Sequence, residues 1–195
     1  LAVEKFYPAN VYGGLTALKS LSAPFPGIKF LPTGGINSHN IGDYIAAPFI
    51  HAVGGSWICT RKDIADGNFD KITALCREAR QNALCFEFAH LGINCENVES
   101  STEVSNFFQT AFDFPLKDGS SSVFASPNIE ILKSPNLGAY GHIAIRTNNI
   151  LCAVPELEKA GFYADTSTAK YKDDRLVALY LKQEIGGFAI HLLQK

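Results

Sequence analysis

The sequence lacks methionine altogether, even at position 1, and opens directly on an apolar run. We therefore expect the natural chain to begin upstream of Leu1. No apolar run approaches the roughly 20 residues of a membrane-spanning helix, and no signal peptide opens the chain, so we expect no membrane association. A dominant charge is also lacking. The net charge of -2 supplies no basic surface for a phosphate backbone, which argues against nucleic-acid binding.

Cysteine is sparse and unpatterned. The five cysteines are scattered, odd in number and without Cys-x-x-Cys spacing, which argues against a disulfide framework or a zinc knuckle. We expect free thiols and a cytoplasmic protein. What the sequence does contain is 47% apolar and 18% charged residues, typical of a soluble globular protein with a real core. A length of 195 residues suffices for one large or two small domains.

Short apolar runs alternate with helical stretches up to about Cys85. This alternation is typical of βαβ units around a parallel sheet. The expected strands are residues 1–8, 28–31 and 49–53. The expected helices are residues 13–23, 38–46 with Ser38 as N-cap, and 68–83.

From Phe86 onward the pattern changes to longer, alternating strands that contain an internal repeat. Residues 88–93 resemble residues 140–145, and residues 128–132 resemble residues 189–193. Each copy reads as a strand, a helix and three strands, the two helices being residues 102–112 and 151–160. We therefore divide the chain into domains 1–85 and 86–195.

Lys5 lies inside the first expected strand. A lysine facing a barrel interior is desolvated, and desolvation favours the neutral amine. A neutral amine attacks a ketone to form an iminium, which acts as an electron sink for carbon–carbon cleavage. From the pattern alone, a lysine that reaches solvent from an edge strand is the alternative interpretation.

Two glycine turns follow the next strands. The segments Pro32-Thr33-Gly34-Gly35 and Val53-Gly54-Gly55-Ser56 each come after an expected strand and before a helix. Paired glycines let backbone amides approach an anion. In (β/α)8 barrels the loops after the last two strands often bind phosphate, so the two turns indicate a phosphorylated ligand.

These motifs, in this order and spacing, resemble the 2-keto-3-deoxy-6-phosphogluconate (KDPG)/2-keto-4-hydroxyglutarate aldolase family. The resemblance runs from Leu1 to about Leu84. It implies the C-terminal portion of a TIM (β/α)8 barrel, a Schiff-base role for Lys5, and a metal-free reaction that releases pyruvate from a phosphorylated keto acid. It also implies a homotrimer. The residues it places around the substrate phosphate are Thr33, Gly34, Gly35, Gly54, Gly55 and Ser56.

The family's first five strands, with its acid/base glutamate and carboxylate-binding arginine, have no counterpart in this sequence. A three-strand remnant cannot close a barrel. We therefore expect this chain alone to be a poor or inactive aldolase.

Three histidines and a glutamate occupy matching places in the repeat. His90 matches His142, and Glu130 matches His191. All four fall within expected strands at positions otherwise filled by apolar residues. Imidazole and carboxylate ligands suit Zn, Ni, Fe, Co or Mn, so these four residues are the candidate metal ligands. The alternative is that each is a satisfied polar residue of a sheet.

The repeat resembles the vicinal-oxygen-chelate (glyoxalase/bleomycin-resistance) family, which implies an α+β domain of two βαβββ modules. The glyoxalase branch of that family uses a His, Glu, His, Glu set. Here His90, Glu130 and His142 match, but His191 stands in the fourth place, which puts glyoxalase activity in doubt. The extradiol dioxygenase branch also expects a late glutamate. A ligand-sensing, regulatory or dimerisation module is the alternative.

A mixed-sign run near the end of the chain is typical of an exposed hairpin tip. It consists of Lys170, Lys172, Asp173, Asp174 and Arg175.

Overall fold

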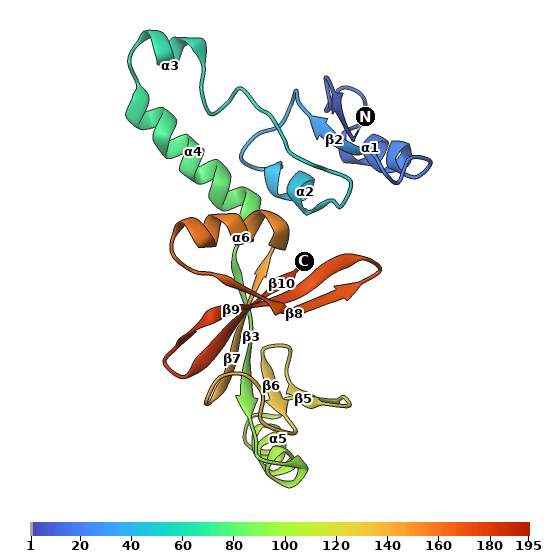
Figure 1. The fold of residues 1–195 in the computed structure, drawn as a ribbon, viewed down its shortest axis with the longest axis vertical. Helices are drawn as coiled ribbons and strands as arrows, with labels where there is room; N and C mark the ends of the chain where they lie inside the picture. The colour runs from blue at the N-terminus through green and yellow to red at the C-terminus, as the bar shows by residue number, and fades with distance from the viewer. Residues whose placement is uncertain (1) are drawn as a thin grey trace. The chain divides into compact units, whose positions relative to one another are not determined.

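The computed structural model describes residues 2–195 and has mixed α/β structure. The chain divides into two compact units, Leu1–Cys85 and Phe86–Lys195 (Figure 1). No helix of the described residues is long and apolar enough to cross a membrane.

The N-terminal unit is a small parallel sheet with helices. Its elements are β1 Val3–Phe6, α1 Gly14–Ser22, β2 Lys29–Pro32, α2 Ile41–Ala46, α3 Arg61–Ala65 and α4 Phe69–Leu84. Strands β1 and β2 pair in parallel, with Lys5 opposite Leu31. The core gathers buried side chains from α1, β2, α2 and α4, among them Leu18, Phe30 and Tyr44.

The third expected strand, residues 49–53, is not formed. Only two isolated bridges stand there, between Phe30 and Ile50 and between Thr33 and Gly54. The first is flanked by two hydrogen bonds, from the Phe30 amide to the Phe49 carbonyl and from the His51 amide to the Phe30 carbonyl, both 2.8 Å. The next residue due to donate is Pro32, which has no N–H, so the ladder stops.

The expected helix cap at Ser38 is also wrong. Helix α2 begins at Ile41, with Asn40 in the N-cap position. The side chain of Asn37 accepts from the His39 amide (2.9 Å), and that of Asn40 accepts from the Asn37 amide (2.9 Å). Such local bonds satisfy backbone groups outside a helix, which delays its first turn.

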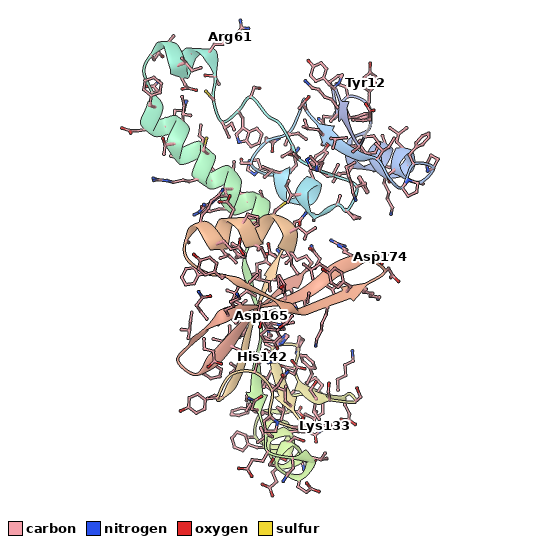
Figure 2. The ribbon with its side chains drawn as sticks, viewed as in Figure 1. Tyr12, Arg61, Lys133, His142, Asp165 and Asp174 are labelled. Carbon is pink, nitrogen blue, oxygen red and sulfur yellow. The ribbon has the colours of Figure 1, made fainter. Side chains whose placement is uncertain are left out.

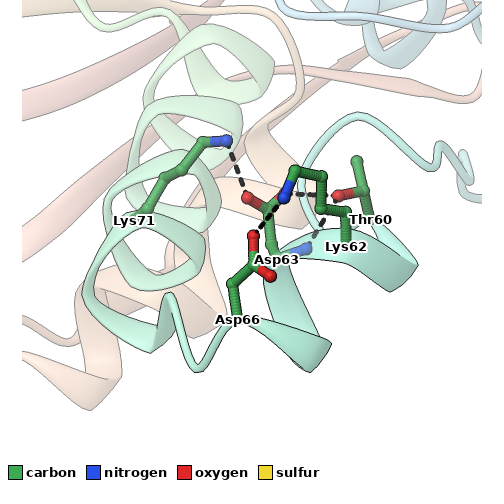
Figure 3. Close-up of polar contacts among 5 residues, drawn as sticks. All are labelled: Thr60, Lys62, Asp63, Asp66 and Lys71. Atoms are coloured by element: carbon green, nitrogen blue, oxygen red, sulfur yellow. Dashed lines mark hydrogen bonds and ion pairs between the residues drawn. The ribbon is translucent and has the colours of Figure 1, made fainter.

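Asp63 anchors the short helix α3 against α4. Its carboxylate accepts hydrogen bonds from Lys71 Nζ (2.7 Å) and Thr60 Oγ1 (2.6 Å), and its amide donates to Thr60 Oγ1 (3.1 Å), as Figure 3 shows. The residue is only 4% exposed. The neighbouring pair of Lys62 and Asp66 is much more exposed.

The C-terminal unit is an eight-stranded sheet built from two like modules (Figure 1). The first module is β3 Glu87–Asn94, α5 Val98–Phe112, β4 Leu116–Asp118, β5 Ser122–Ala125 and β6 Ile129–Leu132. The second is β7 Gly141–Thr147, α6 Ile150–Lys159, β8 Ala164–Lys172, β9 Arg175–Ile185 and β10 Phe188–Gln194. The strand order β4-β5-β6-β3-β7-β10-β9-β8 repeats the arrangement of the first module in the second, and the antiparallel pair of β3 and β7 joins the two.

Alternation along β6 separates the core of this unit from its cavity. Ile129 and Ile131 pack with Val104 and Phe108 of α5. Because neighbouring strand residues point to opposite faces, Glu130 and Leu132 lie on the other side, where they line a cavity.

The expected hairpin tip is confirmed at its centre. Strand β8 ends at Lys172 and β9 begins at Arg175. The two residues between them, Asp173 and Asp174, both have positive φ, as in the tight type I′ turn. Lys170 is exposed, as expected, and it also lies within β8 and lines the cavity.

Candidate functional site

Lys5 lies in the middle of β1 and is exposed, contrary to the expected desolvation. Its ammonium lies 5.9 Å from the centre of the Tyr7 ring. Strand β1 has β2 as its one neighbour among the described residues, so no further strand of the described chain encloses the lysine.

The glycine turns lie beside the end of β1. The amide of Ala9 donates to the Thr33 carbonyl (2.8 Å), and that of Asn10 to the Gly34 carbonyl (3.0 Å). At Gly35, where φ is +86°, an added Cβ would lie 2.3 Å from Asn10 Cβ. This position therefore requires glycine on both conformational and steric grounds.

The second turn reaches the first through the bridge between Thr33 and Gly54. An added Cβ at Gly54 would lie 2.8 Å from Thr33 Cγ2. Thr33 Oγ1 is buried and has no hydrogen-bond partner among the described residues. The structure thus brings Thr33, Gly34, Gly35 and Gly54 together next to the strand of Lys5. Gly55 and Ser56 follow directly in the chain, with Ser56 exposed.

In the C-terminal unit, His90, Glu130 and His142 meet at the centre of the sheet, where Figure 2 labels His142. The two Nε2 atoms are 3.0 Å apart, and each is 3.1 Å from Glu130 Oε2. Both histidines are buried, at 7% and 2% exposure. Two strands of the first module and one of the second supply this triangle.

His191, from β10, completes the group. One nitrogen from each of the three histidines lies within 4.8 Å of the others. The Tyr180 ring stacks on the His191 ring at 4.6 Å and 24°. Burial first, and then the neighbouring histidines, lower the pKa of His191 to about 3, so the ring is neutral at pH 7 and keeps a lone pair for a ligand.

Glu130 is ionised despite being mostly buried. Burial alone would raise the pKa of its carboxyl. Hydrogen bonds from the two histidines outweigh burial, aided by the Ser122 hydroxyl, which donates to Oε1 (2.6 Å). The pKa is therefore held below its usual range. The same charge and, to a greater degree, burial raise the pKa of Tyr180 to about 12, so its phenol keeps its proton.

The residues present fit a divalent cation. Both ring nitrogens of His191 are buried without a hydrogen-bond partner among the described residues, whereas buried polar atoms are nearly always paired. The three donor atoms of His90, Glu130 and His142 lie within 3.1 Å of one another, close enough for one ion to be held by all three.

A cavity of about 490 Å³ opens beside these residues. Its wall is completed by residues from β5, β6, β8, β9, β10 and the segment 134–136. They include Phe124, Leu132, Asn136, Lys170, Ala178, Tyr180 and Leu193.

Sequence reasoning did not single out Ser122, Tyr180 or Gly92. Gly92 stands opposite His142 in the β3–β7 pair, and an added Cβ there would lie 2.1 Å from the His142 ring. Gly92 comes two residues after His90 and therefore lies on the same face of the strand, which indicates from the sequence that it belongs to the site. Ser122 and Tyr180 gave no such signal, because strand pairing alone brings them to the site.

Comparisons with known proteins concern chiefly the N-terminal unit. Residues 1–75 match the family "Aldolase: KDPG and KHG aldolase". The 2-dehydro-3-deoxy-phosphogluconate aldolase of Dickeya dadantii is 47% identical over 75 residues, which are 38% of this chain and 35% of the relative. A KDPG aldolase structure from Legionella pneumophila, with pyruvate captured as a carbinolamine, is 46% identical over 39% of this chain and 37% of its own, with a TM-score of 0.38.

The chain thus spans less than two fifths of the length of the curated relatives it matches. A likeness to methylmalonyl-CoA epimerase from Mycobacterium tuberculosis covers 55% of this chain and 86% of that one. It has 12% identity and a TM-score of 0.41. The match of the first 75 residues, together with 40–47% identity to several curated aldolases, identifies them as a segment of the KDPG and KHG aldolase family.

Proposed function

We propose that residues 1–75 carry the Schiff-base lysine and the phosphate-binding turns of an aldolase that cleaves KDPG or 4-hydroxy-2-oxoglutarate. The observation that supports this is the place of Lys5 on β1, beside the Thr33 and Gly54 turns, in a segment up to 47% identical to curated aldolases.

In this reaction the neutral Lys5 amine adds to the C2 ketone, and water leaves to form the iminium. A base then removes the proton of the C4 hydroxyl, the bond between C3 and C4 breaks, and the C4 fragment leaves as an aldehyde. The electrons of the broken bond pass to the iminium nitrogen and leave an enamine on Lys5. Protonation at C3 and hydrolysis release pyruvate and free the lysine. The amides of the glycine turns would bind the phosphate of KDPG.

The exposure of Lys5 predicts weak turnover by the 195-residue chain, because no further strand of the described residues encloses the lysine and the substrate beside it. We expect pyruvate release from KDPG at a rate at least roughly a hundredfold below that of a full-length relative, a deficit of about 3 kcal/mol in activation free energy. Robust turnover would contradict this expectation.

Borohydride reduction with pyruvate, followed by intact mass and peptide mapping, tests the nucleophile itself. An adduct is expected at Lys5 in the wild-type chain and none in Lys5→Ala. Lys19→Ala, which removes an exposed lysine from α1, is the matched control and should still trap pyruvate. An adduct distributed over many lysines would exclude Lys5 as the specific nucleophile.

We propose a second function for residues 86–195: a divalent metal centre in a domain of vicinal-oxygen-chelate type, ligated by His90, Glu130, His142 and His191. The repeated βαβββ order and the convergence of four donors support it. A bound cation would act there as a Lewis acid. Two neighbouring side chains would orient its ligands. The Ser122 hydroxyl donates to the Glu130 carboxylate, and the Tyr180 ring stacks on His191.

Metal analysis after dialysis tests this centre. We expect one equivalent of Zn, Ni, Fe, Co or Mn per chain. His142→Ala should weaken retention by more than the roughly 10–100-fold that follows loss of an outer-shell partner. His51→Ala is the matched control, because His51 is exposed and lies in the N-terminal unit. Equal metal content in wild type and both variants would rule out the proposed ligands.

A further inference from the structure

Four apolar side chains line the cavity beside the four proposed ligands. They are Phe124, Leu132, Ala178 and Leu193, and the Phe124 ring meets the His90 ring edge-on at 5.4 Å. A volume of about 490 Å³ falls in the usual range for small-molecule sites. The space therefore suits a ligand with a hydrocarbon body rather than a bare inorganic ion.

Lys170 brings a positive charge to this cavity. It stands opposite Ala178 on β9, which in turn stands opposite Leu193 on β10, and all three line the cavity. The pairing of β8 with β9 is irregular just before Lys170, where the Tyr180 amide donates to the Thr168 hydroxyl (2.9 Å) instead of to a backbone carbonyl. Such irregularities redirect side chains.

The ammonium of Lys170 forms no ion pair with the described residues. The contrast with Lys133 is direct, because the ammonium of Lys133 contacts the Asp118 carboxylate (2.7 Å) and the Gly119 carbonyl (2.6 Å). The chain thus neutralises one lysine of this unit and leaves Lys170 available to a ligand.

The charges around the cavity favour an anion. Its lining contains one carboxylate, that of Glu130, and one lysine, Lys170. A divalent cation on the histidines would leave the cavity with a net positive charge, so this step rests on the proposed metal centre. A carboxylate is the common organic group that suits both a cation and an ammonium.

We propose that the cavity binds a small organic acid, with its carboxylate paired to Lys170 and its hydrocarbon body against Leu132, Ala178 and Leu193.

Isothermal titration of the metal-loaded chain with hexanoate, hexanamide and acetate tests the proposal. Hexanoate should bind at least roughly tenfold more tightly than hexanamide, which keeps the chain but loses the charge, and than acetate, which keeps the charge but loses the chain. Lys170→Gln should weaken hexanoate binding roughly tenfold. Lys172→Gln, on the same strand but outside the cavity, makes the same charge change and should leave affinity unchanged.

The Lys5→Ala variant separates this site from the proposed aldolase site and should bind hexanoate as the wild type does. If the chain retains metal but binds hexanoate no better than hexanamide, or if Lys170→Gln binds normally, the inference is overturned and the metal centre stands. If the chain retains no metal, the metal centre fails. The inference then survives only if the preference for hexanoate is still seen and still requires Lys170.

Discussion

Gly92 and His142 face each other across the two central strands, and the imidazole lies where any other residue would place its Cβ. Gly92→Ala should therefore push the His142 ring away from Glu130 without removing a donor atom. We expect metal affinity to fall roughly 10–100-fold, as for loss of a group that orients a ligand. Metal-binding competition with a chelator would measure the change.

The control for this change is Gly27→Ala. Gly27 also has an ordinary φ, and an added Cβ there meets nothing within 4 Å. Its metal affinity should match that of the wild type. A normal affinity in Gly92→Ala would mean that the ring relocates at no cost and that Gly92 has no orienting role.

Two side-chain hydrogen bonds stabilise the carboxylate of Asp63, chiefly the one from Lys71 and next the one from Thr60. Together they lower the pKa of Asp63 from 3.8 to about 2. The folded state thus binds the proton more weakly than the unfolded state. The stabilising effect is complete above about pH 4 and is lost as the pH falls through about 2. Asp63→Asn should lower the melting temperature of the N-terminal unit at pH 6 by roughly 3–6 °C, with the gap narrowing toward pH 2.

Asp66→Asn provides the comparison. It removes an exposed i,i+4 pair with Lys62, and exposed pairs contribute little. Its melting temperature should stay close to that of the wild type at both pH values, and a constant gap for Asp63→Asn would contradict the pKa argument.

Residues of the site could be predicted where they leave a pattern in the sequence. His90, Glu130, His142 and His191 interrupt apolar strands at repeated positions, and the structure brings all four together. Lys170 is exposed, as the mixed-sign run predicts, but the run does not reveal that this residue also lines the cavity, because the irregular pairing of β8 has no signal in the sequence.

Helix α5 shows how local sequence fixes an element. The Asn97 side chain accepts from the Ser100 amide (2.9 Å), and the Ser100 hydroxyl accepts from the Asn97 amide (3.2 Å), a reciprocal capping box. Asn97→Ala should cost about 1 kcal/mol of unfolding free energy. Asn106→Ala, at an exposed mid-helix site, should be neutral or slightly stabilising. Denaturant titration by circular dichroism distinguishes the two, and equal stability would remove the capping role.

The sequence predicts an element well where its apolar residues follow a clear period. It predicts poorly those elements whose limits depend on a partner strand, on a cap or on a very short segment. The strand expected at residues 49–53 failed because its partner strand contains Pro32, whose effect depends on which residue it faces. Helix α3 escaped notice because five residues are too few to show a period. The helix expected at residues 102–112 begins four residues earlier, at Val98, because Asn97 rather than the apolar pattern sets its start.

At the scale of the whole molecule, all four proposed metal ligands and the cavity belong to the C-terminal unit. Residues 86–195 expressed alone should therefore retain one metal ion per chain, with an affinity within roughly threefold of that of the 195-residue chain. Chelator competition measures both. A large loss of affinity would show that the site depends on the N-terminal unit.

The antiparallel pair of β3 and β7 sets how the two modules are aligned with each other. His90 and Glu130 belong to one module, and His142 and His191 to the other. A slip of β3 along β7 by two residues would keep every side chain on its own face of the sheet. It would nevertheless move His90 and Glu130 about 7 Å away from their places beside His142 and His191. Metal retention therefore measures the alignment of the two halves, and a misaligned protein could keep both cores while losing the ion.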